Sequence, residues 1–152
     1  MSNDVYTLSL YDKNGVFNHI AFDVHVRAYN AKMVITQNAR ALLDTGATYT
    51  GITSRFAKSM SLESLKTKNL NTANGMKDCP IYSLDIIFPK DKIFENLEVV
   101  EITDDQQYDI VIGMDIIKMG DIAITHVDGK MMFSLRIPPA GKYINFDNGG
   151  KK

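Results

Sequence analysis

Residues 41–48 read Ala-Leu-Leu-Asp-Thr-Gly-Ala-Thr, an apolar segment that runs directly into an acid, a hydroxyl residue, a glycine and a small residue. Gly46 lets the chain turn sharply, and its missing side chain permits close approach by another backbone or a substrate. The Asp44 carboxylate is thereby presented at the end of a rigid strand, where a catalytic acid or base is best held. The same residues would also suit a simple polar turn, so the motif needs support from elsewhere.

Two further segments supply that support. Residues 108–115 read Tyr-Asp-Ile-Val-Ile-Gly-Met-Asp, which predicts a second buried strand that closes on a glycine and precedes a helical turn. Between the two strands, residues 71–76 read Asn-Thr-Ala-Asn-Gly-Met, a polar hairpin tip inside a long β-segment. The order of the three segments is more informative than any one of them.

Alternation with a period of two predicts strands along most of the chain, with apolar faces in residues 6–10, 20–28, 81–88 and 131–137. Glycine-containing pairs predict hairpin turns at Asn14-Gly15, Asn74-Gly75 and Asp128-Gly129. Helix is scarce: a short helix capped by Thr53 or Ser54 carries Phe56 and Met60, and a helical turn covers residues 114–119. Many short strands joined by such turns favour a small barrel or sandwich.

Composition excludes several classes of function. The length of 152 residues favours one domain. With 17 basic against 18 acidic side chains, the chain has no excess of positive charge for coating a nucleic acid. The single cysteine, Cys79, excludes an internal disulfide, and no histidine or cysteine pattern indicates a metal site or a cofactor. No secretory signal or membrane-spanning segment is evident, so we expect a protein of the cytoplasm.

The ordered set of residues 42–48, the Asn74-Gly75 hairpin and residues 110–115 resembles the retropepsins, the retroviral-type aspartic proteases, in their cellular and bacterial form. The resemblance implies an all-β fold: an acid protease barrel with one or two short helices and one lobe per chain. It predicts a retropepsin-like aspartic protease domain over residues 1–137 and leaves residues 138–152 as an irregular C-terminal tail.

The resemblance also implies roles for particular residues. Asp44 would be the catalytic acid, Thr45 would lock two catalytic loops together across a dimer axis, and Gly46 and Ala47 would line the cleft. A flap would cover the substrate, and the second buried strand would support the catalytic loop from behind. The flap residues are Ala73, Asn74, Gly75, Met76 and Lys77, and the supporting residues are Ile112 and Gly113.

The count of acidic triplets predicts a homodimer without reference to any family. Hydrolysis of a peptide by this chemistry needs two carboxylates that share one proton and one water molecule. The sequence contains one Asp-Thr/Ser-Gly triplet, so a single chain is incomplete. A two-fold axis would bring Asp44 against its own symmetry mate. The expected partners are therefore a second copy and an extended peptide or protein substrate, with no nucleic acid and no membrane.

Two other functions remain open at this stage. The same fold could serve as a catalytically weak or inactive dimer that binds peptides or proteins, because fold does not dictate function. The segment Met76-Lys77-Asp78 favours this alternative, since two of its three residues are charged and a charged flap shoulder would seal a cleft poorly. A monomeric β-barrel that binds a small ligand is the third possibility.

Overall fold

The computed structural model describes residues 4–12, 15, 17–30, 32–72 and 75–147, which form ten strands and two short α-helices. The helices are α1 (Ser54–Ser59) and α2 (Met114–Ile117), and a 3-10 turn covers Pro89–Asp91. The strands are β1 (Tyr6–Tyr11), β2 (Ala21–Tyr29), β3 (Val34–Leu43), β4 (Gly51–Thr53), β5 (Lys66–Thr72), β6 (Gly75–Phe88), β7 (Lys92–Ile102), β8 (Ile110–Ile112), β9 (Asp121–Val127) and β10 (Lys130–Ile137).

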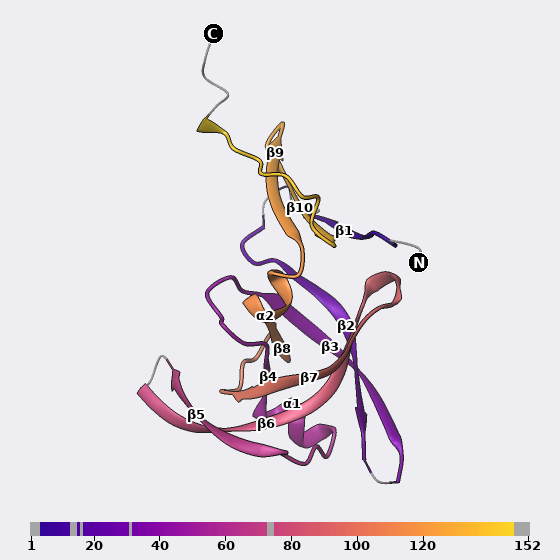
Figure 1. Cartoon of the computed structure of the whole chain (residues 1–152), viewed down its shortest axis with the longest axis vertical. Helices are drawn as coiled ribbons and strands as arrows, with labels where there is room; N and C mark the ends of the chain where they lie inside the picture. The colour runs from indigo at the N-terminus through magenta and orange to yellow at the C-terminus, as the bar shows by residue number, and fades with distance from the viewer. Residues whose placement is uncertain (1–3, 13–14, 16, 31, 73–74, 148–152) are drawn as a thin grey trace.

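Six strands close into a barrel. They follow the order β2-β3-β8-β4-β7-β6, and an additional pairing of β2 with β6 completes the circle. β5 extends the sheet beyond β6 as one arm of the β5–β6 hairpin, which projects from the barrel in Figure 1. The expected all-β retropepsin-like barrel with two short α-helices is therefore confirmed.

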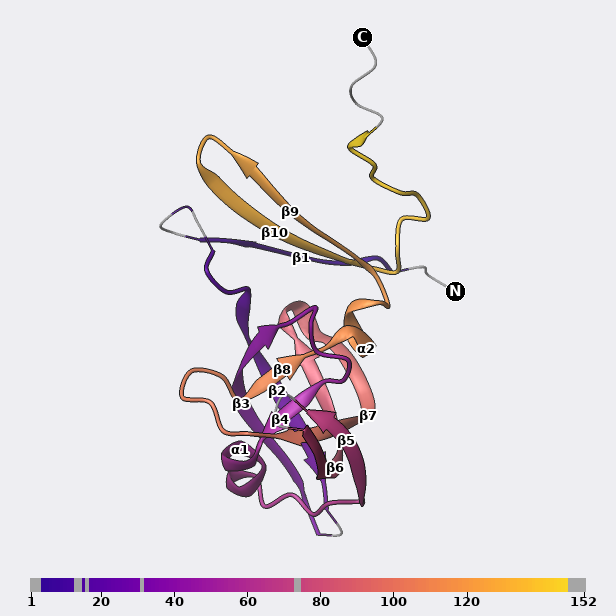
Figure 2. The ribbon, with the colours of Figure 1, turned by 90° about the vertical axis from the view of Figure 1, so that its left-hand side faces the viewer.

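The first and last strands form a separate three-stranded sheet with the order β1-β10-β9. In both views this sheet lies beyond one end of the barrel, and α2 lies where the two meet (Figures 1 and 2). Pairs such as Leu8 with Leu135 join β1 to β10, although more than a hundred residues separate them. The first strand and the last strand of the described chain are thus neighbours in one sheet.

This pairing corrects the hairpin expected at Asn14-Gly15. Asn14 lies outside the described residues, and Gly15 does have a positive φ of 94°, as a turn residue would. β1 and β2 nevertheless belong to different sheets, so no hairpin joins them. Turn chemistry reports the local bend correctly, but the apolar face of β1 finds its partner in β10 instead.

The predicted apolar faces point into one core. Phe22, Val24 and Val26 of β2 are almost fully buried, and Phe88 stacks edge-on against Phe22 with ring centroids 5.0 Å apart. Phe133 of β10 is fully buried in the same core, so the three-stranded sheet shares it with the barrel. Each such side chain contributes about 1.5–3 kcal/mol of burial free energy.

Two of the predicted local signals are confirmed in detail. Thr53 caps α1 by accepting a hydrogen bond from the Phe56 N–H, and the buried Phe56 anchors that helix. Asp128 and Gly129 have φ angles of 49° and 74° and join β9 to β10 as a two-residue hairpin. α2 is shorter than expected and ends at Ile117. Within the described residues, no helix has the length and apolarity to span a membrane.

Candidate active site

Asp44 stands at the carboxyl end of β3, at the point where the chain leaves the barrel. Leu43 before it is buried, whereas Asp44 is exposed. β3 runs parallel to β8 with Leu43 opposite Ile112, and the Asp44 N–H continues this ladder by donating to the Ile112 carbonyl at 3.0 Å. The barrel therefore fixes the backbone of Asp44 while leaving its carboxylate free to meet another molecule.

The turn after Asp44 orients the carboxylate. The Gly46 N–H donates to Asp44 Oδ1 at 2.8 Å, and the Ala47 N–H donates to the Asp44 carbonyl at 3.2 Å. A Cβ on Gly46 would lie only 3.1 Å from that Oδ1, so a side chain there would press on the carboxylate. Thr45 and Gly46 are exposed beside Asp44, and Ala47 is half-buried.

Gly113 lies directly against the far side of this loop. A Cβ at Gly113 would sit 2.6 Å from the Tyr49 carbonyl carbon and 2.9 Å from the Ala47 oxygen, closer than real Cβ contacts come. The next residue, Met114, donates its N–H to the same Ala47 oxygen at 2.8 Å. Residues 44–50 and 112–114 therefore pack backbone against backbone, which only glycine at position 113 permits.

A hydrogen-bonded pair that sequence reasoning missed locks the two segments together. The Asp115 carboxylate accepts from the Thr50 N–H at 2.8 Å and from the Thr50 hydroxyl at 2.7 Å. The Thr50 oxygen in turn accepts from the Gly113 N–H at 3.2 Å. Thr50 is fully buried, so this network fixes the end of the segment that begins with Asp44 from within. Asp115 stood in the quoted motif, but nothing in the sequence paired it with a residue 65 positions earlier.

The expected flap is the β5–β6 hairpin. Thr72 pairs with Gly75, and the two residues between them, Ala73 and Asn74, lie outside the described part of the chain. Gly75 has a φ of 94°, and Met76 is 67% exposed. Among the described residues, 75–77 make no hydrogen bond or ion pair with residues 44–47.

A different contact joins the β5–β6 hairpin to residues 44–50. The Lys68 ammonium of β5 lies 4.8 Å from the centre of the Tyr49 ring. Tyr49 lies within residues 44–50, the segment that begins with Asp44, and is 44% exposed. Such a cation–π contact between exposed groups contributes about 0.5–1 kcal/mol. The structure thus connects the body of the β5–β6 hairpin to the loop that carries Asp44.

A pocket of about 410 Å³ opens beside Asp44. Its wall is mostly apolar, and His19 on its rim lies 2.8 Å from the Tyr108 hydroxyl through Nδ1. No group of three or more potential metal ligands occurs among the residues that the structure describes. The lining residues are Phe17, Asn18, His19, Ile20, Leu42, Leu43, Asp44, Ile124 and Met131.

Comparison with known proteins agrees with this geometry. A family model described as aspartyl protease matches residues 31–116, more than half of the chain, and the protein belongs to that family. Among solved structures, a retropepsin-like aspartic protease from Rickettsia conorii matches with a TM-score of 0.58 and 16% identity. That match covers 90% of this chain and 95% of the other. A search of curated proteins finds no match.

The family and the fold together support a protease of the aspartic type, and the predicted resemblance to retropepsin-like proteases is confirmed. At 16% identity the Rickettsia structure bears on the fold alone. The roles of individual residues therefore rest on the geometry of this chain.

Proposed function

We propose that the protein is an aspartic endopeptidase that works as a homodimer, with Asp44 from each subunit forming the catalytic pair. One observation carries the proposal. The Asp44 carboxylate is exposed at the end of a barrel strand and oriented by the Gly46 N–H at 2.8 Å. A charged side chain that is fixed in position yet open to solvent is suited to act on a second molecule.

The two subunits are needed because the chemistry takes two carboxylates. One carboxylate removes a proton from a water molecule while the water oxygen bonds to the carbonyl carbon of the substrate. The other gives its proton to the carbonyl oxygen, which produces a tetrahedral diol. The diol collapses when one of its hydroxyls returns a proton to the carboxylate that had given one, the C–N bond breaks, and the departing nitrogen takes the proton that the other carboxylate had removed from water. No metal, cofactor or covalent intermediate takes part.

The neighbours of Asp44 would have distinct tasks. The exposed Thr45 hydroxyl would bond to the partner's catalytic loop, and Gly46 and Ala47 would line the floor of the cleft. Ile112 and Gly113 would hold the loop from behind through the backbone contacts described above. The hairpin tip that contains Ala73, Asn74, Gly75, Met76 and Lys77 would close over the substrate as a flap.

The substrate would be an extended peptide of several residues. An extended chain can add β-type hydrogen bonds to the backbone of flap and floor while its side chains alternate between pockets. The apolar pocket beside Asp44 has a volume of about 410 Å³ and would receive one such side chain. The assignment of residues 1–137 to the protease domain and 138–152 to a tail stays a prediction.

Cleavage of a degenerate peptide library tests the proposal. The wild-type chain should release new amino termini, and Asp44→Asn should abolish them because the amide can neither take nor give the required proton. Asp23→Asn is the matched control, since its carboxylate is 83% exposed on the barrel surface and pairs with Arg40. Equal background cleavage by wild type and Asp44→Asn would contradict the proposal.

A dimer that binds peptides without cutting them is the second candidate. It is favoured by the charged residues of the hairpin shoulder, since Lys77 and Asp78 are exposed and Asp78 accepts a hydrogen bond from Asn69 at 2.7 Å. Asp78 therefore has a hydrogen-bond partner within the hairpin in the absence of substrate. Retention of library peptides without cleavage, equally by wild type and Asp44→Asn, would support this function instead.

A further inference from the structure

His19 lies beside Asp44 at the end of the barrel. The Leu43 N–H donates to the Ile20 carbonyl at 2.8 Å, so the pairing of β2 with β3 continues up to the residues next to His19 and Asp44. Both side chains line the pocket of about 410 Å³, and they are the two ionisable side chains among its described lining residues. A peptide side chain in this pocket would therefore meet an imidazole as well as the Asp44 carboxylate.

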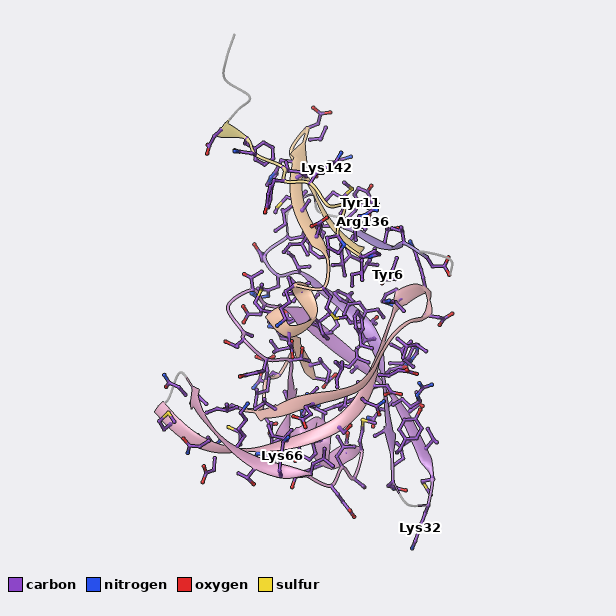
Figure 3. The ribbon with its side chains drawn as sticks, viewed as in Figure 1. Tyr6, Tyr11, Lys32, Lys66, Arg136 and Lys142 are labelled. Carbon is purple, nitrogen blue, oxygen red and sulfur yellow. The ribbon has the colours of Figure 1, made fainter. Side chains whose placement is uncertain are left out.

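A second pocket of similar size lies elsewhere. It has a volume of about 420 Å³ and includes Lys32 in its lining. Figure 3 shows Lys32 at the opposite end of the molecule from Arg136, which stands on β10 of the three-stranded sheet. The pocket that contains His19 is lined in part by residues of β9 and β10, so it lies at the end of the molecule where Asp44 is exposed. Of the two pockets, this is the one that a peptide bound at Asp44 would enter.

One nitrogen of the His19 ring is already engaged. The Tyr108 hydroxyl lies 2.8 Å from Nδ1, and the two rings meet edge-on with centroids 5.8 Å apart. When the hydroxyl donates this bond, the neutral ring carries its proton on Nε2, and a protonated ring carries one there as well. Nε2 makes no hydrogen bond within the described part of the chain, and His19 is exposed. Its N–H is therefore available to an acceptor on a bound peptide.

Tyr108 is itself held by the loop that precedes β8. Its N–H donates to Asp105 Oδ1 at 2.9 Å, and the Gln107 N–H donates to the same oxygen at 2.7 Å. These two hydrogen bonds lower the pKa of Asp105, and the nearby charge of His19 lowers it further. The Asp105 carboxylate thus fixes the backbone of Tyr108, and the Tyr108 hydroxyl in turn orients the imidazole of His19.

The charges near the ring decide which acceptor fits. Asp44 shares the pocket with His19, and Asp105 interacts with His19 electrostatically. A carboxylate from the substrate would be placed near both of these like charges, which disfavours glutamate. The neutral amide of glutamine avoids this conflict: its oxygen can accept from Nε2, while its two methylene groups lie against the mainly apolar wall.

We propose that His19 determines specificity by binding a glutamine side chain of the peptide substrate in the pocket beside Asp44, through a hydrogen bond from Nε2 to the amide oxygen. Tyr108 is the positioning residue that orients the ring. This inference rests on the proposed function, because it names a substrate class for the same site. His19 is exposed, so water competes for Nε2, and the bond should favour glutamine over methionine by about three- to tenfold relative to a chain without the imidazole.

Retention of peptides by the Asp44→Asn chain tests the inference without any need for cleavage. A degenerate peptide library is passed over this immobilised chain, and the retained peptides are sequenced to give the ratio of glutamine to methionine at each position. Adding His19→Phe should lower this ratio at one position by about three- to tenfold, because an aromatic ring is kept while the donor is lost. His25→Phe is the matched control, since His25 is exposed on β2 and does not line this pocket.

Tyr108→Phe provides the second measurement. It should lower the same ratio by less than His19→Phe does, because the imidazole stays but loses the hydrogen bond that orients it. A ratio that His19→Phe leaves unchanged, or that His25→Phe lowers equally, would overturn the inference. A preference of the wild-type chain for glutamate over glutamine at this position would also overturn it.

The two proposals can fail separately. Retention of peptides that depends on His19, in a protein whose wild type cleaves none of them, contradicts only the proposed function. Cleavage by wild type that Asp44→Asn abolishes, with a ratio of glutamine to methionine that ignores His19→Phe, contradicts only this inference.

Discussion

The carboxylate of Asp115 and the hydroxyl of Thr50 lie 2.7 Å apart, and this hydrogen bond joins the first turn of α2 to the end of the loop that carries Asp44. The Thr50 N–H donates a second hydrogen bond to the same carboxylate. Because Thr50 is fully buried, neither hydrogen bond competes with bulk water. The buried Thr50 thus holds the end of the loop that carries Asp44 against α2.

Thr50→Val should lower the free energy of unfolding by about 1–3 kcal/mol, because it removes a hydrogen bond to a charged group and leaves the Gly113 N–H without its acceptor. Urea denaturation followed by circular dichroism measures the change. Thr48→Val is the control: Thr48 is exposed, so the same substitution there should change stability by less than about 0.5 kcal/mol. Equal stabilities of the two variants would show that the network does not support the loop.

Gly113→Ala and Gly46→Ala should separate stability from activity. At Gly113 the new methyl group meets backbone 2.6 Å away that cannot move aside, so we expect a loss of about 1–3 kcal/mol or more in the free energy of unfolding. At Gly46 the methyl group meets the Asp44 carboxylate at 3.1 Å. That variant should fold with a small loss of stability but cleave peptides poorly. Thermal melts and peptide cleavage on both variants check this, and a stable, folded Gly113→Ala would contradict the packing described.

Asp85 predicts a pH-dependent contribution to stability. This carboxylate is buried in β6, and burial by itself raises its pKa, but the hydrogen bond from the Asn96 N–H opposes that effect. Hydrogen bonds from Arg27 and Tyr29 act in the same direction, so the net pKa lies below the ordinary value of 3.8. The stabilisation is therefore fully present above pH 3.8 and is lost as pH falls through the lowered pKa.

Asp85→Asn should consequently lower the free energy of unfolding by about 1.5–3 kcal/mol at neutral pH, because it removes the charge that the Arg27 guanidinium and the other donors bind. The difference in the free energy of unfolding between wild type and Asp85→Asn should become smaller as the solution is acidified. Denaturant titrations at several pH values measure this. Asp23→Asn breaks the exposed pair with Arg40 and should change stability by less than about 0.5 kcal/mol. If the difference between wild type and Asp85→Asn stayed constant from neutral to strongly acidic pH, the lowered pKa of Asp85 would be contradicted.

The sequence predicts the barrel well wherever one face of a strand is buried. β2 and β10 follow strict alternation, so their apolar faces could be assigned residue by residue. β6 departs from this pattern at Asp85, which is buried beneath its hydrogen-bond donors Arg27, Tyr29 and the Asn96 N–H, where β6 shifts register against β7 between Leu84 and Ile86. Alternation cannot reveal a bulge, since the partner strand causes it.

The candidate site shows the same division between local and distant information. The Asp44 turn could be anticipated because the residues that shape it are adjacent in the chain. The Asp115–Thr50 contact and the pairing of β1 with β10 could not be, because each joins segments far apart in sequence. Turn residues such as Asn14-Gly15 report only a local bend and do not specify which strands pair.

Mixing of subunits tests most directly whether two Asp44 carboxylates share one active site. Wild type and Asp44→Asn are combined in equal amounts, exchanged to equilibrium, and assayed for peptide cleavage at constant total protein. If each site needs Asp44 from both subunits, only homodimers of wild type work, and activity should fall to about one quarter of that of pure wild type. Activity of about three quarters would mean that a single Asp44 per site suffices, and activity of about one half would mean that each subunit works on its own; either result would contradict the account.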